Sequence, residues 1–586
     1  MDITYDNLSD EQKQFCDLAL SGNNIRVEAC IGSGKTTAIQ TLCNLFPKNK
    51  WILYLTYNKL LKVDAKAKIT NTNVVVTNYH GFVYPYLQRN GIRCSVSDAI
   101  KTFVKNRLSI PRFNILIIDE YQDIELDFAE MLEYIKSTNP KMQIIMVGDM
   151  AQKIYDKTTL DVKKWSDEFL GNYKELAFTQ CFRLQPELAA KLSRIWNKPI
   201  IGVNTDCCVR TMGKDSIVTY LKDKNPNDIL CLGSKSGSMM SVLNILETRF
   251  PYKFNKKTIY AGINNDASDV EPTQNTAIFT TYDSSKGMER PICVVFDWDE
   301  AYWKVRNNQT GTNSEILRNI FCVAASRGKK EIIFVQNIAY GRPVNLLSEE
   351  TLRTPIPTKK LKHAYTNKMF SFKYIEEIEK AYEMLDINLL QPKHEIITIN
   401  SHDALIDLTP CIQIYQHAIF FKNYNIECDI NYEFQQNNQA MPDITDYSIE
   451  QKILMLTSLR TKQNRYYNQV SLPLVTPAQR NSLISRLSEQ LSPNENVQAS
   501  TSIQLFDVTI YATCDVIRDD SIWNIEFKRE LKPEDYLKNA IESIMFGKKQ
   551  AVLWNTRTNE IYRISVSKDQ RDAFLKQTYR IITKQQ

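Results

Sequence analysis

A glycine-rich turn between an apolar run and a helical run constrains the fold of this chain more than any other feature. Residues 27–37 read VEACIGSGKTT, in which Ala29 replaces the first glycine of the strict consensus. The glycines let backbone N–H groups curl around phosphates, and the N-terminus of the following helix favours negative charge. Lys35 can reach the β- and γ-phosphates, and the hydroxyl of Thr36 can coordinate Mg²⁺. The predicted phosphate-binding residues are Gly32, Ser33, Gly34, Lys35, Thr36 and Thr37.

Two adjacent acidic residues follow a fully apolar run. The segment 115–123 reads ILIIDEYQD and places Asp119 and Glu120 at the end of a predicted strand. Carboxylates in such a place are costly unless a cation or another partner is near. Asp119 therefore suits Mg²⁺ coordination, and Glu120 suits polarisation of the water that attacks a phosphate. Together with the glycine-rich turn, this pair predicts a site that hydrolyses a nucleoside triphosphate.

Apolar runs at the spacing of βαβ units predict α/β domains with parallel, doubly wound sheets. The first set is IRVEAC, WILYLTY, NVVVTNY, FNILIIDE and QIIMVGD, and the second is DSIVTYL, DILCLGS, TAIFTTY, ICVVFDW and EIIFVQN. Farther along, helical patterns are expected around 373–386, 447–462 and 534–546, and strands near 503–513 and 521–528. We expect two α/β domains at 1–190 and 191–345, a linker and helical region at 346–420, and an α+β domain at 421–586.

The segment DEYQD resembles the DExQD box of UvrD/Rep-like superfamily 1 helicases, and further motifs of that family occur in its order. They are LSDEQ at 8–12, LTYNK at 55–59, TNYHGF at 77–82, VGDMAQKIY at 147–155, QCFRL at 180–184, TTYDSSKGME at 280–289 and VAASRGKK at 323–330. The resemblance implies two RecA-like domains with small insertions. It also implies an ATP-dependent translocase or helicase that moves 3′ to 5′ on single-stranded or tailed DNA.

Under this resemblance, ATP and Mg²⁺ bind between the two α/β domains. Gln12 is matched to the residue that reads adenine, and Phe182 to an aromatic residue that stacks on it. Gln152 is matched to a γ-phosphate sensor. The residues expected in catalysis are Lys35, Asp119, Glu120, Gln152, Arg183 and Arg327, with Glu289 as a further matched position at the nucleotide. Positioned arginines stabilise charge on the transferred phosphoryl group, typically by about 10³–10⁵ in rate.

The same motifs imply contacts to a nucleic-acid strand, through base stacking and phosphate binding. The matched residues are Thr56, Tyr57, Asn58, Thr77, Tyr79, His80, Tyr155 and Lys286. The sequence departs from the family after Tyr155, where DKTTL replaces a segment with a further base-stacking residue. The interval between Arg183 and Thr280 is also too short for a large inserted subdomain. Elements that separate a duplex are therefore expected to be reduced, or supplied by a protein partner.

The C-terminal part resembles a second family. In YATCDVIRDDSIWNIEFKRE, Asp515, Glu526 and Lys528 resemble the D…ExK core of PD-(D/E)XK nucleases of the RecB-like group. The resemblance implies that Asp515 and Glu526 hold Mg²⁺ or Mn²⁺ and that Lys528 positions the attacking water. The following helix carries Glu542 and Phe546 where that group has Gln and Tyr, and Glu450 is the candidate for an upstream acidic ligand. The alternative is a non-catalytic module that binds DNA or a protein partner.

Composition indicates the cellular compartment of the protein but does not identify its function. The formal net charge of +6 permits a polyanionic partner, although binding depends on local clusters rather than on the sum. Thirteen cysteines without CxxC spacing fit a reducing compartment better than a disulfide framework. No apolar run is long enough to span a membrane. We therefore expect an intracellular, cytoplasmic protein, and a nucleotide-gated switch without motor activity stays a third functional alternative.

Overall fold

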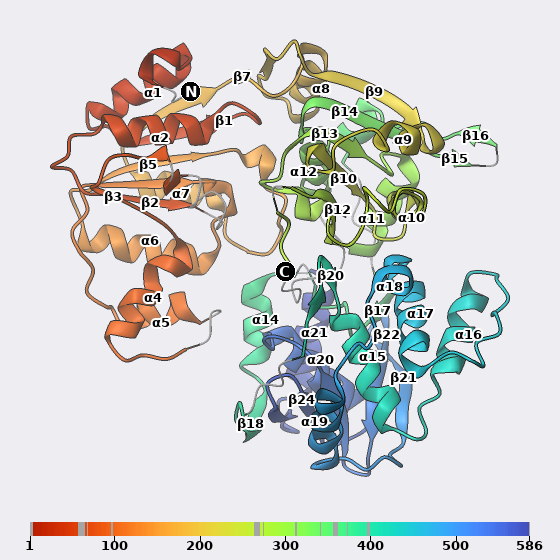
Figure 1. The fold of residues 1–586 in the computed structure, drawn as a ribbon. Helices are drawn as coiled ribbons and strands as arrows, with labels where there is room; N and C mark the ends of the chain where they lie inside the picture. The colour runs from red at the N-terminus through yellow and green to blue at the C-terminus, as the bar shows by residue number, and fades with distance from the viewer. Residues whose placement is uncertain are drawn as a thin grey trace.

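A computed structural model describes residues 4–56, 65–66, 68–94, 98–262, 270–273, 275–310, 313–339, 341–355, 361–371, 373–394 and 399–584. It contains three large β-sheets, each in its own region of the chain (Figure 1). The expected fold class is confirmed: two RecA-like α/β domains are followed by an α+β domain. Within the described residues, no helix is long and apolar enough to cross a membrane.

The first domain is built on a parallel sheet with strand order β3-β2-β4-β5-β1-β6. The strands are β1 (Ile25–Ala29), β2 (Ile52–Thr56), β3 (Val74–Asn78), β4 (Ile115–Asp119), β5 (Gln143–Gly148) and β6 (Lys174–Phe178). The helices are α1 (Asp10–Leu20), α2 (Lys35–Leu45), α4 (Tyr79–Arg89), α5 (Ala99–Lys105), α6 (Leu126–Thr138) and α7 (Val162–Leu170). Successive residues of β2 point to opposite faces, so Leu53 packs under α4–α7 while Ile52 and Tyr54 pack under α1 and α2. A sheet buried on both faces explains why its strands read as continuous apolar runs.

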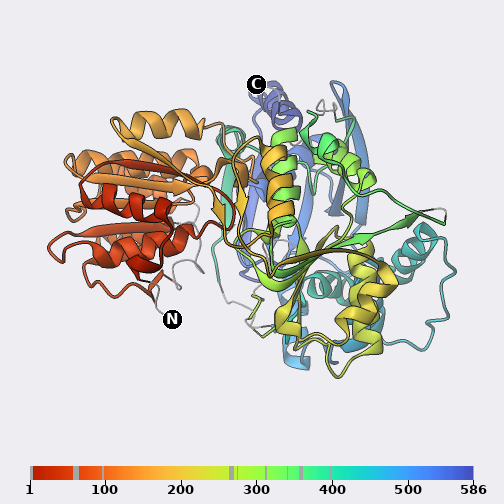
Figure 2. The same cartoon turned by 90° about the horizontal axis from the view of Figure 1, so that it is seen from above.

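The second domain has a parallel sheet with strand order β11-β12-β10-β13-β14-β9, beside the first domain (Figure 2). Its strands are β9 (Cys208–Gly213), β10 (Ile229–Gly233), β11 (Ile259–Gly262), β12 (Ala277–Thr281), β13 (Arg290–Val295) and β14 (Gly328–Gln336). Its helices are α8 (Pro186–Trp196), α9 (Lys214–Leu221), α10 (Ser238–Arg249), α11 (Glu300–Thr310) and α12 (Ser314–Ala324). A short ladder of β7 (Gln180–Cys181) and β8 (Ile201–Gly202) precedes this domain.

The prediction of one strand in the second domain is wrong. The run DSIVTYL forms helix α9, whose buried side chains are Ile217, Val218 and Leu221. These three residues share one helical face and pack against the sheet, so the spacing is that of a helix rather than of a strand. The strand position at this edge of the sheet is filled by β9, whose sequence CVRTMG is too polar to be recognised as a buried strand.

The C-terminal domain has a mixed sheet with order β17-β22-β23-β24-β25-β18, and β21 pairs with β22. Its strands are β17 (His363–Tyr365), β18 (Asp386–Gln391), β21 (Val497–Leu505), β22 (Val508–Ile517), β23 (Ser521–Glu526), β24 (Gln550–Asn555) and β25 (Glu560–Ser565). Its helices include α14 (Ile375–Tyr382), α15 (Thr409–Phe420), α16 (Ile426–Gln436), α17 (Ile449–Thr461), α18 (Arg465–Gln469), α19 (Pro477–Ser488), α20 (Pro533–Met545) and α21 (Arg571–Thr583).

The strands of this domain differ from expectation in two places. The run near 503–513 is divided between β21 and β22 by a turn in which Phe506 has a positive φ of 52°. Asp515 therefore lies inside β22 rather than after a strand. In addition, β17 and β18 come from the segment expected as a linker and helical region, yet they are strands of the C-terminal sheet. β17 has three residues, too few to show an alternating pattern, and β18 is exposed along most of its length and has no buried face to recognise.

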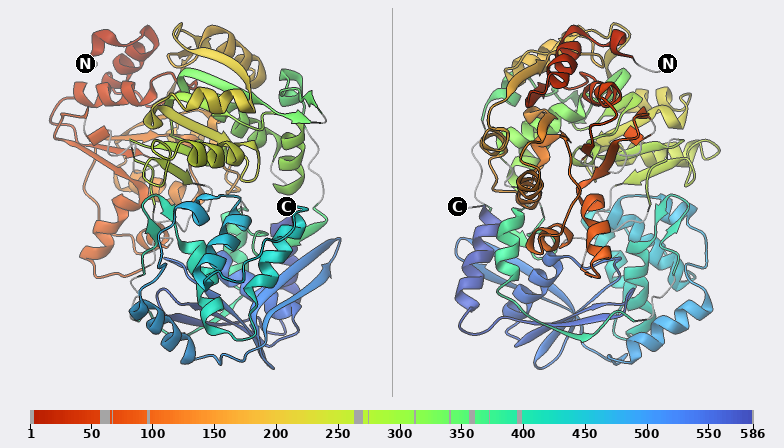
Figure 3. Two further views of the ribbon diagram at one scale, coloured as in Figure 1. Left: turned by 45° about the vertical axis from the view of Figure 1, so that its right-hand side comes forward. Right: turned by 90° about the vertical axis from the view of Figure 1, so that its left-hand side faces the viewer.

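The C-terminal domain contacts both RecA-like domains (Figures 1 and 3). Toward the first domain, the carboxylate of Asp156 lies 2.6 Å from the Lys584 ammonium, and the amide of Ile375 donates to the carbonyl of Lys157 at 2.7 Å. Toward the second domain, the guanidinium of Arg465 lies 3.1 Å from Glu247, and both side chains are almost fully buried. We call these contacts the first seam and the second seam.

Candidate nucleotide site and candidate nuclease site

The glycine-rich turn lies between β1 and α2, as predicted. Gly32 and Gly34 have φ values of +69° and +74°, in the region that favours glycine. A Cβ atom on Gly32 would lie 2.7 Å from Cβ of Arg183, and one on Gly34 would lie 2.9 Å from Nε2 of Gln12. The turn thus needs glycine for its backbone and for the close approach of two other predicted site residues. Thr36 and Thr37 lie in the first turn of α2.

The two predicted carboxylates lie beside the buried side chain of Lys35. Its ammonium is 3.6 Å from Oε1 of Glu120, and the hydroxyl of Tyr54 donates to Oδ2 of Asp119 at 3.0 Å. Burial, together with the charge of Glu120, raises the pKa of Asp119. Burial would also raise the pKa of Glu120, but the charges of Lys35 and Lys286 outweigh it and lower that pKa. Glu120 is thus held ionised, while Oδ1 of Asp119 is buried without a hydrogen-bond partner.

Two arginines reach this region, Arg183 from the segment that precedes the second domain and Arg327 from within that domain. Arg183 follows β7 and donates from Nη2 to Oε2 of Glu289 at 2.6 Å. Arg327 lies between α12 and β14, is buried, and has no hydrogen-bond partner at Nε or Nη2. Burial and the charge of Arg183 lower the pKa of Arg327 to about 10, while Glu120 acts in the opposite direction. The site therefore brings together charged groups from both domains and leaves guanidinium donors available to an anion.

The residues expected around adenine lie next to the glycine-rich turn. Gln12 donates from Nε2 to the carbonyl of Ser33 at 2.9 Å. Phe182 is 45% exposed, and its ring lies 3.9 Å from the position of a Cβ on Gly34. A planar base can therefore stack on a partly exposed ring beside the phosphate loop.

The predicted γ-phosphate sensor is connected to residues at the boundary between the RecA-like domains. Gln152 donates from Nε2 to Asp149 at 2.8 Å, and its carbonyl accepts from the ammonium of Lys286 at 3.2 Å. Lys286 also forms a buried ion pair with Asp123. The ammonium of Lys286, predicted to bind DNA, is thus engaged by the first domain in this conformation.

The other residues predicted to contact a strand have different environments. Tyr155 donates through its hydroxyl to the carbonyl of Asp283 at 3.3 Å. Tyr79 is buried and stacks on Phe128 at a centroid distance of 4.3 Å, so its ring packs in the core, whereas His80 is half-buried at the edge of the same ring. Thr56 and Thr77 are buried at the ends of β2 and β3, and Tyr57 and Asn58 lie outside the described residues.

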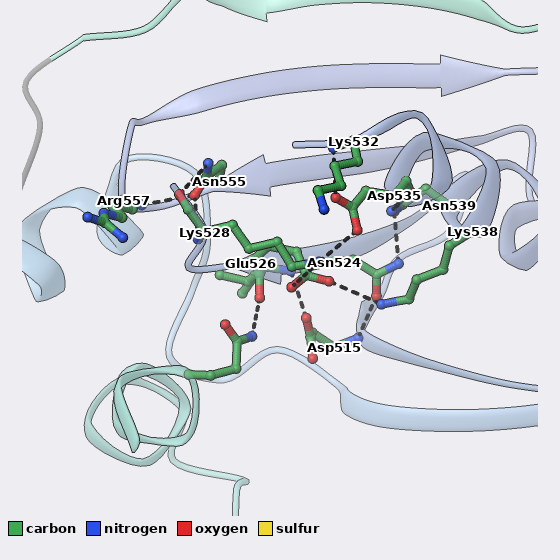
Figure 4. A network of polar contacts seen from close by, with 12 residues as sticks. Asp515, Asn524, Glu526, Lys528, Lys532, Asp535, Lys538, Asn539, Asn555 and Arg557 are labelled. Atoms are coloured by element: carbon green, nitrogen blue, oxygen red, sulfur yellow. Dashed lines mark hydrogen bonds and ion pairs between the residues drawn. The ribbon is translucent and has the colours of Figure 1, made fainter. Parts of the chain in front are cut away.

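The predicted C-terminal residues also come together (Figure 4). Oδ2 of Asp515 accepts from the amide of Ile525 at 2.7 Å. Lys528 places its ammonium 3.3 Å from Oε2 of Glu526 and 2.7 Å from Oδ1 of Asp535. Burial would raise the pKa of Glu526, but Lys538 and Lys528 outweigh it and lower that pKa. The carboxylates are held ionised on neighbouring strands.

Three side chains of this cluster were missed in the sequence. Nε2 of His417, on α15, lies 3.1 Å from Oδ1 of Asp515. Asp535 and Lys538 lie on α20, and the Lys538 ammonium is 3.2 Å from Oε1 of Glu526. The only available signal for the α20 residues was their helical spacing from Glu542, and none indicated His417.

The other residues predicted for the nuclease site, Glu542, Phe546 and Glu450, make contacts other than those expected of metal-site residues. Glu542 is buried and accepts from Asn524 at 2.6 Å, and burial raises its pKa to about 7. Phe546 caps the C-terminus of α20 and packs beside the core. The carboxylate of Glu450 accepts from the amide of Leu474 at 3.2 Å, which stabilises a loop after α18. Among the described residues, no group of three or more His, Cys, Asp or Glu side chains is arranged as a metal site.

Comparisons with known proteins agree with the N-terminal part of this description. A family profile described as an AAA domain matches residues 12–158, which include the glycine-rich turn and the DEYQD segment. No curated protein matches the chain.

Similarity to solved structures is weak. S. cerevisiae Dbp5 bound to RNA and ADP BeF3 is 13% identical, with a TM-score of 0.34 over 56% of this chain and 84% of that one. The DUF1998 helicase MrfA bound to DNA is 12% identical, with a TM-score of 0.33 over 56% of this chain and 49% of that one. An arterivirus nonstructural protein 10 (helicase) is 12% identical, with a TM-score of 0.27 over 54% of this chain and 61% of that one.

Proposed function

We propose that this chain is an ATP-driven motor that moves on single-stranded DNA, in the 3′ to 5′ direction that its motifs suggest. One observation supports this most strongly. Asp119 in the first domain and Arg327 in the second domain both have buried polar atoms that make no hydrogen bond. Leaving such a group unsatisfied costs about 1–3 kcal/mol. A nucleoside triphosphate with its Mg²⁺ offers a cation for one and phosphate oxygens for the other.

The surrounding residues have roles that follow from their positions. Lys35 would hold the β- and γ-phosphates, and Thr36 and Asp119 would hold the cation, which would supply charge neutralisation at the phosphate oxygens. Glu120 is ionised and can accept a proton from the attacking water. Arg183 and Arg327 stabilise the charge that develops on the transferred group.

Movement on a strand would follow from the position of ATP between domains. The contacts of Lys286 with Asp123 and with the carbonyl of Gln152 join the two domains next to Tyr155. A change at the γ-phosphate that moves Gln152 would therefore alter the grip of Tyr155 on a base.

The motor is tested by ATP hydrolysis with and without oligonucleotides. Lys35→Ala and Arg327→Ala should each lower strand-stimulated kcat by about 10³-fold or more. Arg249→Ala, an exposed arginine of the same domain, is the matched control. Hydrolysis that persists in both variants would refute the site, and hydrolysis that no strand stimulates would favour a nucleotide-gated switch. DNA and RNA strands with 3′ or 5′ duplex tails test the nucleic acid and the direction.

We further propose that the C-terminal domain is a metal-dependent deoxyribonuclease. The supporting observation is that the carboxylates of Asp515 and Glu526 extend from neighbouring strands beside Lys528 (Figure 4), because carboxylates are ligands that suit Mg²⁺ or Mn²⁺. Such a cation would supply an activated water and a Lewis acid for the scissile phosphate. Lys528, held by Glu526 and Asp535, is placed to orient that water.

The nuclease is tested with end-labelled single-stranded and duplex DNA in Mg²⁺ or Mn²⁺. Asp515→Asn and Lys528→Ala should abolish strand loss while ATP hydrolysis stays intact. Strand loss that survives Lys528→Ala would contradict this assignment. Binding of DNA without any cleavage, in wild type and variants alike, would instead support a non-catalytic binding module.

A further inference from the structure

Lys538 lies in the candidate nuclease site, but the proposed chemistry gives it no role. It projects from the second turn of α20, the helix that follows the Glu526–Lys528 strand end. Its ammonium is 3.2 Å from Oε1 of Glu526, and its side chain is only 19% exposed (Figure 4). A long lysine side chain loses rotamer freedom when it is held in this way. The attraction between the ammonium and the Glu526 carboxylate therefore has to offset that loss of conformational entropy.

The two oxygens of Glu526 are thus occupied by two different ammonium groups. Lys528 approaches Oε2, and Lys538 approaches Oε1. Asp515 is likewise satisfied, by His417 at one oxygen and by the amide of Ile525 at the other. A cation that approaches Glu526 therefore meets positive charge already in place and is repelled by it.

The two lysines are not equivalent. Lys528 has a second carboxylate partner, Asp535, at 2.7 Å, which holds it beside the site when Glu526 is engaged elsewhere. For Lys538, the carboxylate within ion-pair distance is Glu526 itself. Displacement from Glu526 would therefore free Lys538 more readily than Lys528.

We propose that Lys538 occupies the place of a divalent cation on Glu526 and leaves it when the metal and the DNA phosphate bind together. Lys538 is then a positioning residue that makes metal binding depend on substrate. Without DNA, the metal has to displace Lys538 with no new partner for the ammonium. With DNA, a phosphate oxygen takes the place of Glu526 as its partner. This inference rests on the proposed nuclease function.

The test measures Mn²⁺ affinity rather than cleavage. Full-length wild type and Lys538→Met are titrated with Mn²⁺, and free Mn²⁺ is followed by electron paramagnetic resonance. The titrations are repeated with a phosphorothioate single strand that resists cleavage. Asp515→Asn identifies the binding that belongs to this site, and Lys549→Met, which alters a well-exposed ion pair with Asp520, is the matched control.

Without DNA, Lys538→Met should bind Mn²⁺ at least about tenfold more tightly than wild type, because one repelling charge is gone. The strand should tighten Mn²⁺ binding by wild type about tenfold and leave Lys538→Met unchanged, since coupling between two ligands is reciprocal. If Lys538→Met binds Mn²⁺ no more tightly than wild type, or if DNA still tightens its Mn²⁺ binding, the role proposed for Lys538 is overturned while the nuclease proposal stands. Absence of any Asp515-dependent Mn²⁺ binding, in wild type and variant, overturns the nuclease proposal as well.

Discussion

The nucleotide site and the C-terminal cluster are both built from buried lysines and carboxylates, but they differ in how far these groups satisfy one another. In the nucleotide site, Oδ1 of Asp119 and two nitrogens of Arg327 are buried without partners. In the C-terminal cluster, each oxygen of Asp515 and Glu526 lies within ion-pair or hydrogen-bond distance of another group, although Nε2 of His417 makes no hydrogen bond. The first site is incomplete without a ligand, whereas the second is neutralised by its own side chains. Sequence motifs of equal appearance can therefore mark sites with different needs.

The largest expected effect is a loss of ATP hydrolysis, a reaction proposed for the nucleotide site and not for the C-terminal cluster. Glu120→Gln keeps the shape of the side chain and removes its charge, so it should lower ATP hydrolysis by about 10²–10⁴-fold, the usual contribution of a general base. Binding of a fluorescent ATP analogue should be retained, because Lys35 and the glycine-rich turn remain. Glu130→Gln, an exposed residue on α6, is the control. Loss of nucleotide binding together with hydrolysis would show that Glu120 is structural.

A second prediction concerns Glu542, a buried carboxyl group next to the C-terminal cluster whose negative charge the cluster does not neutralise. Burial raises the pKa of Glu542 from its ordinary value near 4.5 to about 7. Because the folded pKa is above the unfolded one, the stabilising contribution is present below pH 4.5 and is lost as the pH rises through 7. The loss is on the order of 3 kcal/mol. Denaturant unfolding of Glu542→Gln should lack this decline between pH 5 and 8, whereas Glu530→Gln, at an exposed position, should keep it.

The smallest expected effect compares the two sites by ligand-induced stabilisation. Mg²⁺ with a non-hydrolysable ATP analogue at about 100 times its Kd should stabilise the folded protein by about 2.7 kcal/mol. Mn²⁺ alone, at millimolar concentration, should raise the Tm less, because it has to displace ion pairs in the C-terminal cluster. Thermal unfolding in Lys35→Ala and Asp515→Asn assigns each shift to its site. A larger Tm increase with Mn²⁺ alone would break the comparison.

Local features of the sequence placed the glycine-rich turn and the acidic pair of the candidate nucleotide site at the ends of strands, because these residues come from segments that fold locally. The VEACIGSGKTT turn and the DEYQD strand end each needed only one strand and one turn to be placed. The strand β9 was missed because its residues are polar and lie at a sheet edge. The role of α9 was misjudged because a short apolar run has the same appearance in a buried strand and in a helix.

The C-terminal cluster was predicted only in part, for a different reason. Asp515 and Glu526 lie on adjacent strands, Lys528 follows two residues after the second of them, and the three follow a known pattern. His417 and Lys538 reach the same place from α15 and α20, and their meeting depends on how these helices pack on the sheet. Tertiary packing of this kind leaves no periodic signal. The strand contacts predicted for Tyr57 and Asn58, which lie outside the described residues, stay predictions.

The first and second seams have a mechanical consequence. Each of the three domains contacts the other two, so a movement of any one domain would change contacts with both of the others. Removing one partner of the buried pair of Arg465 and Glu247 would be costly, and the contacts at 156–159 combine backbone hydrogen bonds with the largely buried ion pair of Asp156 and Lys584. Those four residues directly follow Tyr155. The first seam therefore begins directly after the residue expected to hold the strand, so a movement between the first and C-terminal domains would act on the chain next to that residue.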